Sequence, residues 1–104
     1  MILLKHGVSI NECRREILIA LITKIAPWFE DFDVDCVITS ASENFKHSAE
    51  RSKHYCGDAL DIRSRELSDR QQVELAKALE KELRDDFVVI LEKDHFHIHY
   101  APRR

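Results

Sequence analysis

Phe87-Val-Val-Ile-Leu-Glu-Lys-Asp-His-Phe-His-Ile-His-Tyr100 is the stretch that decides the fold. It contains two runs of strand length, and the polar residues near Lys93 and Asp94 between them are typical of a turn. The stretch therefore predicts a C-terminal β-hairpin. In its second strand the three histidines are two residues apart, so we expect their side chains to share one face of the strand.

Two helices are predicted upstream of this hairpin. Ser9 with Glu12, and Ser68 with Gln71, have the spacing of a capping box, in which two side chains each satisfy a free backbone N–H. We expect the first helix to follow Ser9 and to end at Pro27, and the second to follow Ser68. The apolar residues that recur at helical spacing are Ile10, Cys13, Ile17, Leu21 and Ile25 in the first helix and Val73, Leu75, Ala78, Leu79 and Leu83 in the second.

Short runs at 35–39 and 59–62 indicate two strands between the helices. The chain of 104 residues contains no internal repeat, linker or low-complexity segment. These patterns predict a single α+β domain over residues 1–104, built from a small antiparallel sheet with a C-terminal hairpin and two main helices.

Composition and charge limit the classes of partner that the protein is expected to bind. The hydrophobic fraction of 44% and the charged fraction of 34% are ordinary for a soluble globular protein, and a net charge of −3 argues against a nucleic-acid partner. No run has the length of a membrane span, and the N-terminus lacks the apolar run of a signal peptide, so we expect no membrane partner and a cytoplasmic location in the producing cell. The three cysteines have no CxxC spacing, which favours free thiols in a reducing compartment.

A second segment carries side chains that suit a metal. It is Ser52-Lys-His-Tyr-Cys-Gly-Asp-Ala-Leu-Asp61. A catalytic zinc ion typically takes three imidazole, thiolate or carboxylate ligands and keeps one open position. We expect His54 on a loop, Gly57 to allow a tight backbone path, and Asp61 on the following strand, where small Ala59 on the same face leaves space beside the metal.

The third zinc ligand should come from the last strand. His95, His97 and His99 are the candidates, because three imidazoles on one strand face are poorly suited to core packing. A zinc-bound water has a pKa near 7, and a neighbouring carboxylate can accept its proton. We prefer Asp94, at the predicted turn, as this base, with Glu92 as the second choice.

The residues at Ser52, His54, Gly57, Ala59 and Asp61 match the SxHxxGxAxD signature of a zinc peptidase family. This family includes D-alanyl-D-alanine carboxypeptidases and dipeptidases, phage endolysins and murein endopeptidases, and the zinc-binding module of hedgehog signalling proteins is similar. The closing Asp94-His95-x-His97 resembles the family's second motif. The resemblance covers roughly residues 38 to 100 and implies a hedgehog/D-Ala-D-Ala peptidase-like fold.

The resemblance also implies roles for individual residues. His54, Asp61 and His97 would be the zinc ligands, Asp94 the general base, and His95 a neighbour of the metal water or the oxyanion. Family members often have an arginine before the first motif that can bind a substrate carboxylate, but Thr39-Ser-Ala-Ser-Glu43 contains none. The residues that could orient the peptide instead are Ser52, His47, Arg51 and Arg63.

The sequence therefore predicts a zinc-dependent metallopeptidase that hydrolyses a peptide bond of bacterial cell-wall (peptidoglycan) peptides. The expected absence of a signal peptide suits a phage lysis enzyme or a virion component that reaches the wall by other means, and an intracellular peptidase fits as well. The alternative is a catalytically inactive, zinc-stabilised binding module.

Overall fold

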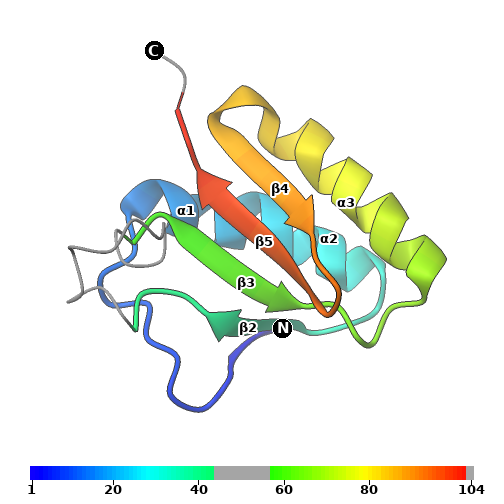
Figure 1. The fold of residues 1–104 in the computed structure, drawn as a ribbon, viewed down its shortest axis with the longest axis horizontal. Coiled ribbons are helices and arrows are strands. Elements are labelled where there is room, and N and C mark those ends of the chain that lie inside the picture. The colour runs from blue at the N-terminus through cyan, green and yellow to red at the C-terminus, as the bar shows by residue number, and fades with distance from the viewer. Residues whose placement is uncertain (44–56, 103–104) are drawn as a thin grey trace.

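The computed structural model describes residues 1–43 and 57–102, which form an α+β fold, as predicted (Figure 1). The elements, in chain order, are β1 (Ile2–Leu4), α1 (Arg15–Ala20), the π-helix η1 (Leu21–Ile25), α2 (Ala26–Asp31), β2 (Cys36–Ser40), β3 (Ala59–Arg63), α3 (Asp69–Leu83), the short 3₁₀ turn η2 (Arg84–Asp86), β4 (Phe87–Leu91) and β5 (His95–Tyr100). None of the helices in these two ranges combines the length and the apolar character needed to cross a membrane.

The five strands form one mixed sheet in the order β1-β2-β3-β5-β4. β1 pairs parallel to β2, while the other neighbours are antiparallel. The prediction of a wholly antiparallel sheet is therefore wrong at this edge. Ile2–Leu4 has no alternating pattern and finds its partner more than thirty residues away, at Cys36–Ile38, so local patterning could not reveal it.

The helices cover one face of the sheet. Inward-facing side chains alternate with outward-facing ones along β3 and β5, and the inward-facing Leu60, Ile62, Phe96 and Ile98 are fully buried. Ala59, on the other face, is fully buried as well. In Figure 1, α1, η1 and α2 lie behind the sheet and α3 runs along β4. The rings of Phe29 on α2 and Phe96 on β5 meet edge to face, with centroids 5.7 Å apart, and join the helical layer to the sheet. The strand residues of the core are Cys36, Ile38, Leu60, Ile62, Phe96 and Ile98.

The first helical segment differs from its prediction at both ends. It begins at Arg15, so the predicted capping box at Ser9 and Glu12 is wrong. The hydroxyl of Ser9 accepts a hydrogen bond from the backbone of Asn11 instead, inside a loop. The helix also continues through Pro27 to Asp31. The π-helical turns just before the proline shift the hydrogen-bond register, so that Pro27 falls in the first turn of α2, where its missing N–H costs little.

The other local predictions are confirmed. Ser68 and Gln71 form the capping box that begins α3, with the Gln71 N–H donating to Ser68 Oγ at 3.2 Å and the Ser68 N–H donating to Gln71 Oε1 at 3.0 Å. β4 and β5 have the predicted bounds, and the Glu92 N–H donates to the His95 carbonyl oxygen at 2.9 Å to close their turn. The hairpin therefore carries its histidines onto the sheet face that the helices leave open.

Candidate functional site

Asp61 on β3 and His97 on β5 are direct partners across two antiparallel strands. Directly opposed residues point to the same side of a sheet, and here that is the face without helices. Asp61 Oδ1 lies 2.9 Å from His97 Nδ1, and each side chain is about one-fifth exposed (19% and 20%). The tertiary fold thus joins two predicted zinc ligands that are 36 residues apart in the chain.

These two side chains fit one half of a zinc site. Donors about 2.0–2.1 Å from a tetrahedral zinc ion lie roughly 3.3 Å from each other, close to the separation seen here. Within residues 1–43 and 57–102, no three His, Cys, Asp or Glu side chains form a complete metal-binding group. The third predicted ligand, His54, lies outside the described residues, so among the described residues the Asp61–His97 pair is the part of the predicted zinc site that can be examined.

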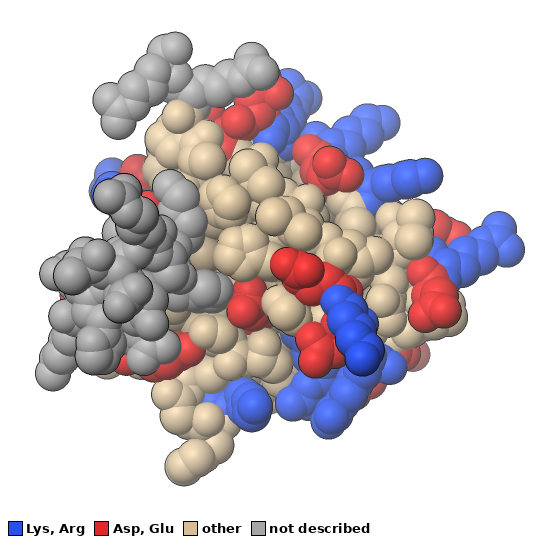
Figure 2. Space-filling model, in the orientation of Figure 1, with Lys and Arg blue, Asp and Glu red and all other residues tan. Residues whose placement is uncertain are grey.

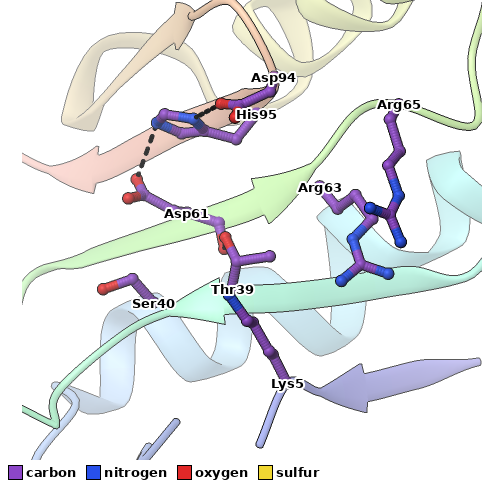
Figure 3. A pocket seen from close by; sticks show the side chains of 8 residues that line it. All are labelled: Lys5, Thr39, Ser40, Asp61, Arg63, Arg65, Asp94 and His95. Carbon is purple, nitrogen blue, oxygen red and sulfur yellow. Dashed lines mark hydrogen bonds and ion pairs between the residues drawn. The ribbon is translucent and has the colours of Figure 1, made fainter. Parts of the chain in front are cut away.

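His95 and Asp94 lie beside this pair (Figure 3). His95 Nε2 is 3.7 Å from Asp61 Oδ1, and its other ring nitrogen, Nδ1, is 2.7 Å from Asp94 Oδ1. The hydrogen bond with His95 lowers the pKa of the Asp94 carboxyl below its ordinary value, which keeps this exposed group ionised. Asp94 thus holds one nitrogen of the ring while the other faces Asp61.

His99 extends the row on the opposite side. His97 Nε2 lies 3.0 Å from His99 Nδ1, and the two rings meet at an interplanar angle of 61°. With Nε2 held by His99, the Nδ1 atom of His97 is the one directed at Asp61. A metal-binding histidine is usually oriented in this way, by a hydrogen bond from its other nitrogen.

The chain that enters β3 is held by close packing against the N-terminal loop. Gly57 has φ +74°, and a Cβ at this position would collide with the carbonyl oxygen of Glu12. The Arg14 N–H donates to the Gly57 carbonyl at 2.8 Å, and the Arg14 guanidinium forms an ion pair with Asp58. Gly57 has the tight backbone path that the sequence predicts, two residues before β3 begins.

A pocket of about 390 Å³ opens next to Asp61 and His95. Figure 3 shows the side chains of Lys5, Arg63 and Arg65 at the other end of its lining. Arg63, predicted to orient a substrate, is therefore a pocket residue. Sequence reasoning missed Lys5, Arg65, Thr39 and Ser40. Lys5 was missed because it follows β1, a strand that the sequence did not predict. The period of two along the strand 35–39 could have placed Thr39 on this face.

The segment Thr39–Glu43, which contains no arginine, is held by hydrogen bonds between its own residues. Glu43 accepts hydrogen bonds from Ser40 Oγ at 2.5 Å and from the Ala41 N–H at 2.9 Å. Burial raises the pKa of Glu43, but these hydrogen bonds lower it by more, so the net pKa lies below the ordinary value. The carboxylate thus stabilises the chain that leaves β2.

Several predicted site residues are not placed. Ser52, Arg51 and His47 lie outside the described residues, as does His54. Glu92, the second candidate for the base, is exposed in the β4–β5 turn and does not line the pocket.

Figure 2 shows the face that Figure 1 presents, with acidic side chains near its middle and Lys and Arg side chains below them. No protein-family model, no curated protein and no solved structure matches this chain.

Proposed function

We propose that this protein is a zinc-dependent peptidase with the hedgehog/D-Ala-D-Ala peptidase-like fold, acting on peptides of the bacterial cell wall. One observation carries the proposal: Asp61 and His97, which the motif match marks as metal ligands, approach to 2.9 Å on an open sheet face. At 2.9 Å the pair forms a hydrogen bond, and a zinc ion taking the place of the shared proton would find an oxygen and a nitrogen donor already close to the spacing that tetrahedral coordination needs.

The remaining residues complete the proposed site. His54 would be the third zinc ligand, and His99 would hold His97 by its Nε2 atom. When bound, zinc supplies Lewis acidity, which polarises a carbonyl group and lowers the pKa of a water molecule to about 7. The pocket beside Asp61 gives an extended peptide access to the open face.

Asp94 would transfer a proton, and His95 would stabilise the negative charge that develops during hydrolysis. In hydrolysis the oxygen of a water molecule bonds to the carbonyl carbon, the C–N bond breaks, and one water proton passes to the leaving amine. We assign Asp94 as the general base that takes this proton, with His95 Nε2 positioned to stabilise negative charge on the carbonyl oxygen. Their 2.7 Å contact makes them a coupled pair, so a change at either residue affects proton transfer.

The proposal is tested with the purified chain stripped of metal by chelator and then titrated with zinc. We expect one zinc ion to bind per chain and new amino groups to appear when peptidoglycan is added. Asp94→Asn should keep the zinc and lose at least about a hundredfold in kcat, as expected for a general base. Glu92→Gln is the matched variant in the same turn.

Each result has a defined meaning. Loss of activity in Glu92→Gln but not in Asp94→Asn would move the base to Glu92. Binding of one zinc ion per chain with no hydrolysis of any wall peptide would overturn the peptidase proposal and support the zinc-stabilised binding module. Failure to bind zinc would overturn both.

A further inference from the structure

The strand β1 is an edge of the sheet with no protection against further pairing. It stands last in the strand order, next to β2, whereas the opposite edge strand, β4, lies beside α3 (Figure 1). All of its side chains are apolar and exposed, Ile2 by 36%, Leu3 by 40% and Leu4 by 45%. Native proteins usually protect an edge strand with a charge, a proline or a bulge, and β1 contains none of these.

The backbone of β1 directs hydrogen-bonding groups away from the sheet. The Lys5 N–H donates to β2 and the Met1 carbonyl oxygen accepts from β2, both at 2.9 Å. Successive residues of a strand direct their N–H and C=O groups to opposite sides, so those of Ile2 and Leu4 point to the outer edge. Among the described residues no strand lies on that side. The edge therefore offers two donors and two acceptors to another strand.

Antiparallel pairing of two copies of β1 uses all four groups. With Leu3 opposite Leu3 of the second copy, Ile2 of each copy lies opposite Leu4 of the other, as a pair that exchanges both N–H···O bonds. The arrangement has a two-fold axis at Leu3, as a contact between identical surfaces requires. It also sets apolar side chains opposite each other on both faces of the strand, which removes them from water.

The two ends of β1 differ in charge. Lys5 follows the strand, is exposed, and forms no ion pair with a described residue. At the other end a hollow of about 280 Å³ beside Met1 is lined by three acidic residues, Glu30, Asp33 and Asp35. Asp35 lies 3.7 Å from the Met1 amino group, but a pair between such exposed groups is weak, and two further carboxylates remain. This end is therefore acidic.

The antiparallel register brings these opposite charges together. Ile2 aligns with Cys36, so Met1 aligns with Asp35. Lys5 of the second copy would lie opposite Met1, on the same face as Asp35. Two strand spacings of about 4.8 Å separate the lysine from Asp35, a distance that the two side chains together can span. By symmetry the contact forms twice, so the charges favour the same register as the backbone groups.

We propose that β1 is a dimerisation strand, to which β1 of a second copy of this chain adds antiparallel, joining two five-stranded sheets into one. The inference does not depend on the peptidase function. Opposed residues of antiparallel strands point to the same side, so the open faces that carry Asp61 and His97 would lie on one side of the joined sheet. Because the strands are short, the contact is small, and we expect a dissociation constant of about 1–100 μM.

Sedimentation velocity of the full chain, at concentrations below and above this range, tests the proposal. We expect a monomer–dimer equilibrium. Leu3→Lys sets two lysines opposite each other at the two-fold axis and should weaken the dimer about tenfold or more. Ile90→Lys is the matched control, because Ile90 is 41% exposed on the other edge strand and Leu3 is 40% exposed. It should leave the dimer unchanged.

Two charge reversals test the register. Lys5→Glu and Asp35→Lys each oppose like charges at both ends of the contact, so each variant by itself should associate more weakly than the native chain. In an equal mixture of the two variants, a mixed pair has opposite charges at both ends. Association should therefore return to near the native strength in the mixture.

Hydrogen exchange supplies a measurement that needs no variant. The Leu4 N–H points to the outer edge, so it should exchange slowly at concentrations where the dimer forms and rapidly in the monomer. Slow exchange that does not depend on concentration would mean that the edge is covered within one chain, and would overturn the proposal.

The other outcomes are equally defined. A chain that stays monomeric at all concentrations would overturn the proposal, and would leave the edge to a partner of another kind. A dimer that persists in Leu3→Lys, or is lost equally in Ile90→Lys, would also overturn it. A mixture that associates no better than its components would overturn the antiparallel register. Thermal unfolding establishes that each variant is folded.

Discussion

Asp61 and His97 face each other across neighbouring strands, with Asp61 Oδ1 2.9 Å from His97 Nδ1. Backbone pairing of β3 with β5 fixes this relationship, so the two donors are in place without any movement of the main chain. A site that is formed in advance costs little conformational entropy when a ligand binds.

His97→Ala should weaken zinc binding by more than about a hundredfold, because loss of a metal ligand exceeds the 10–100-fold effect of losing an outer partner. Competition with a chromophoric chelator measures the affinity. His6→Ala is the matched control, since His6 is exposed in the loop after β1 and no role is assigned to it. Unchanged zinc affinity in His97→Ala would transfer the ligand role to another histidine of β5.

His99→Phe should weaken zinc binding by about 10–100-fold while leaving the stoichiometry at one. The phenyl ring keeps much of the side-chain volume but removes the 3.0 Å contact between His99 Nδ1 and His97 Nε2, so His97 loses the group that orients it. Should zinc be lost altogether, His99 would be a ligand itself and not an orienting group.

Gly57→Ala should cost about 3 kcal/mol or more of unfolding free energy in urea, because the new methyl group meets the Glu12 carbonyl oxygen at a positive φ. Gly7→Ala provides the control. Its φ is +87° but no atom lies within 4 Å of the new Cβ, so only backbone strain of about 1–2 kcal/mol is expected. Equal losses in the two variants would show that Gly57 has no packing role.

Glu43 should contribute to stability above pH 5 and lose that contribution in acid. Its pKa in the folded chain is lowered, so the ionised form stabilises the fold above the unfolded value of about 4.3, and this stabilisation disappears as the pH falls through the lower folded pKa. In Glu43→Gln, the deficit in unfolding free energy relative to the native chain should be constant from pH 7 to pH 5 and shrink toward pH 3. The same measurement on Glu80→Gln, on the exposed side of α3, is the control.

Local signals predicted most of the secondary structure. The capping box at Ser68 and Gln71 and the hairpin runs at 87–91 and 95–100 depend on contacts between residues close in the chain, and the structure confirms all three. The Ser9–Glu12 spacing was misleading because the same two residues satisfy loop contacts, with Asn11 and with Ser42. No local sequence signal near Pro27 predicts the π-helical segment Leu21–Ile25, which allows the helix to continue through the proline.

By itself, the sequence determined the α+β character of the fold, the shared face of His95, His97 and His99, and which donor side chains the candidate site contains, because strand periodicity and side-chain type are local properties. Only the tertiary structure decided that Asp61 lies opposite His97, that Asp94 holds His95, and that Lys5 joins Arg63 at the same pocket. Those relationships depend on strand order and register, which are set by burying Ile38, Leu60, Ile62, Phe96 and Ile98 against the helices. A register shift of one residue would turn the histidines into the core, so packing of the inner face is what positions the outer one.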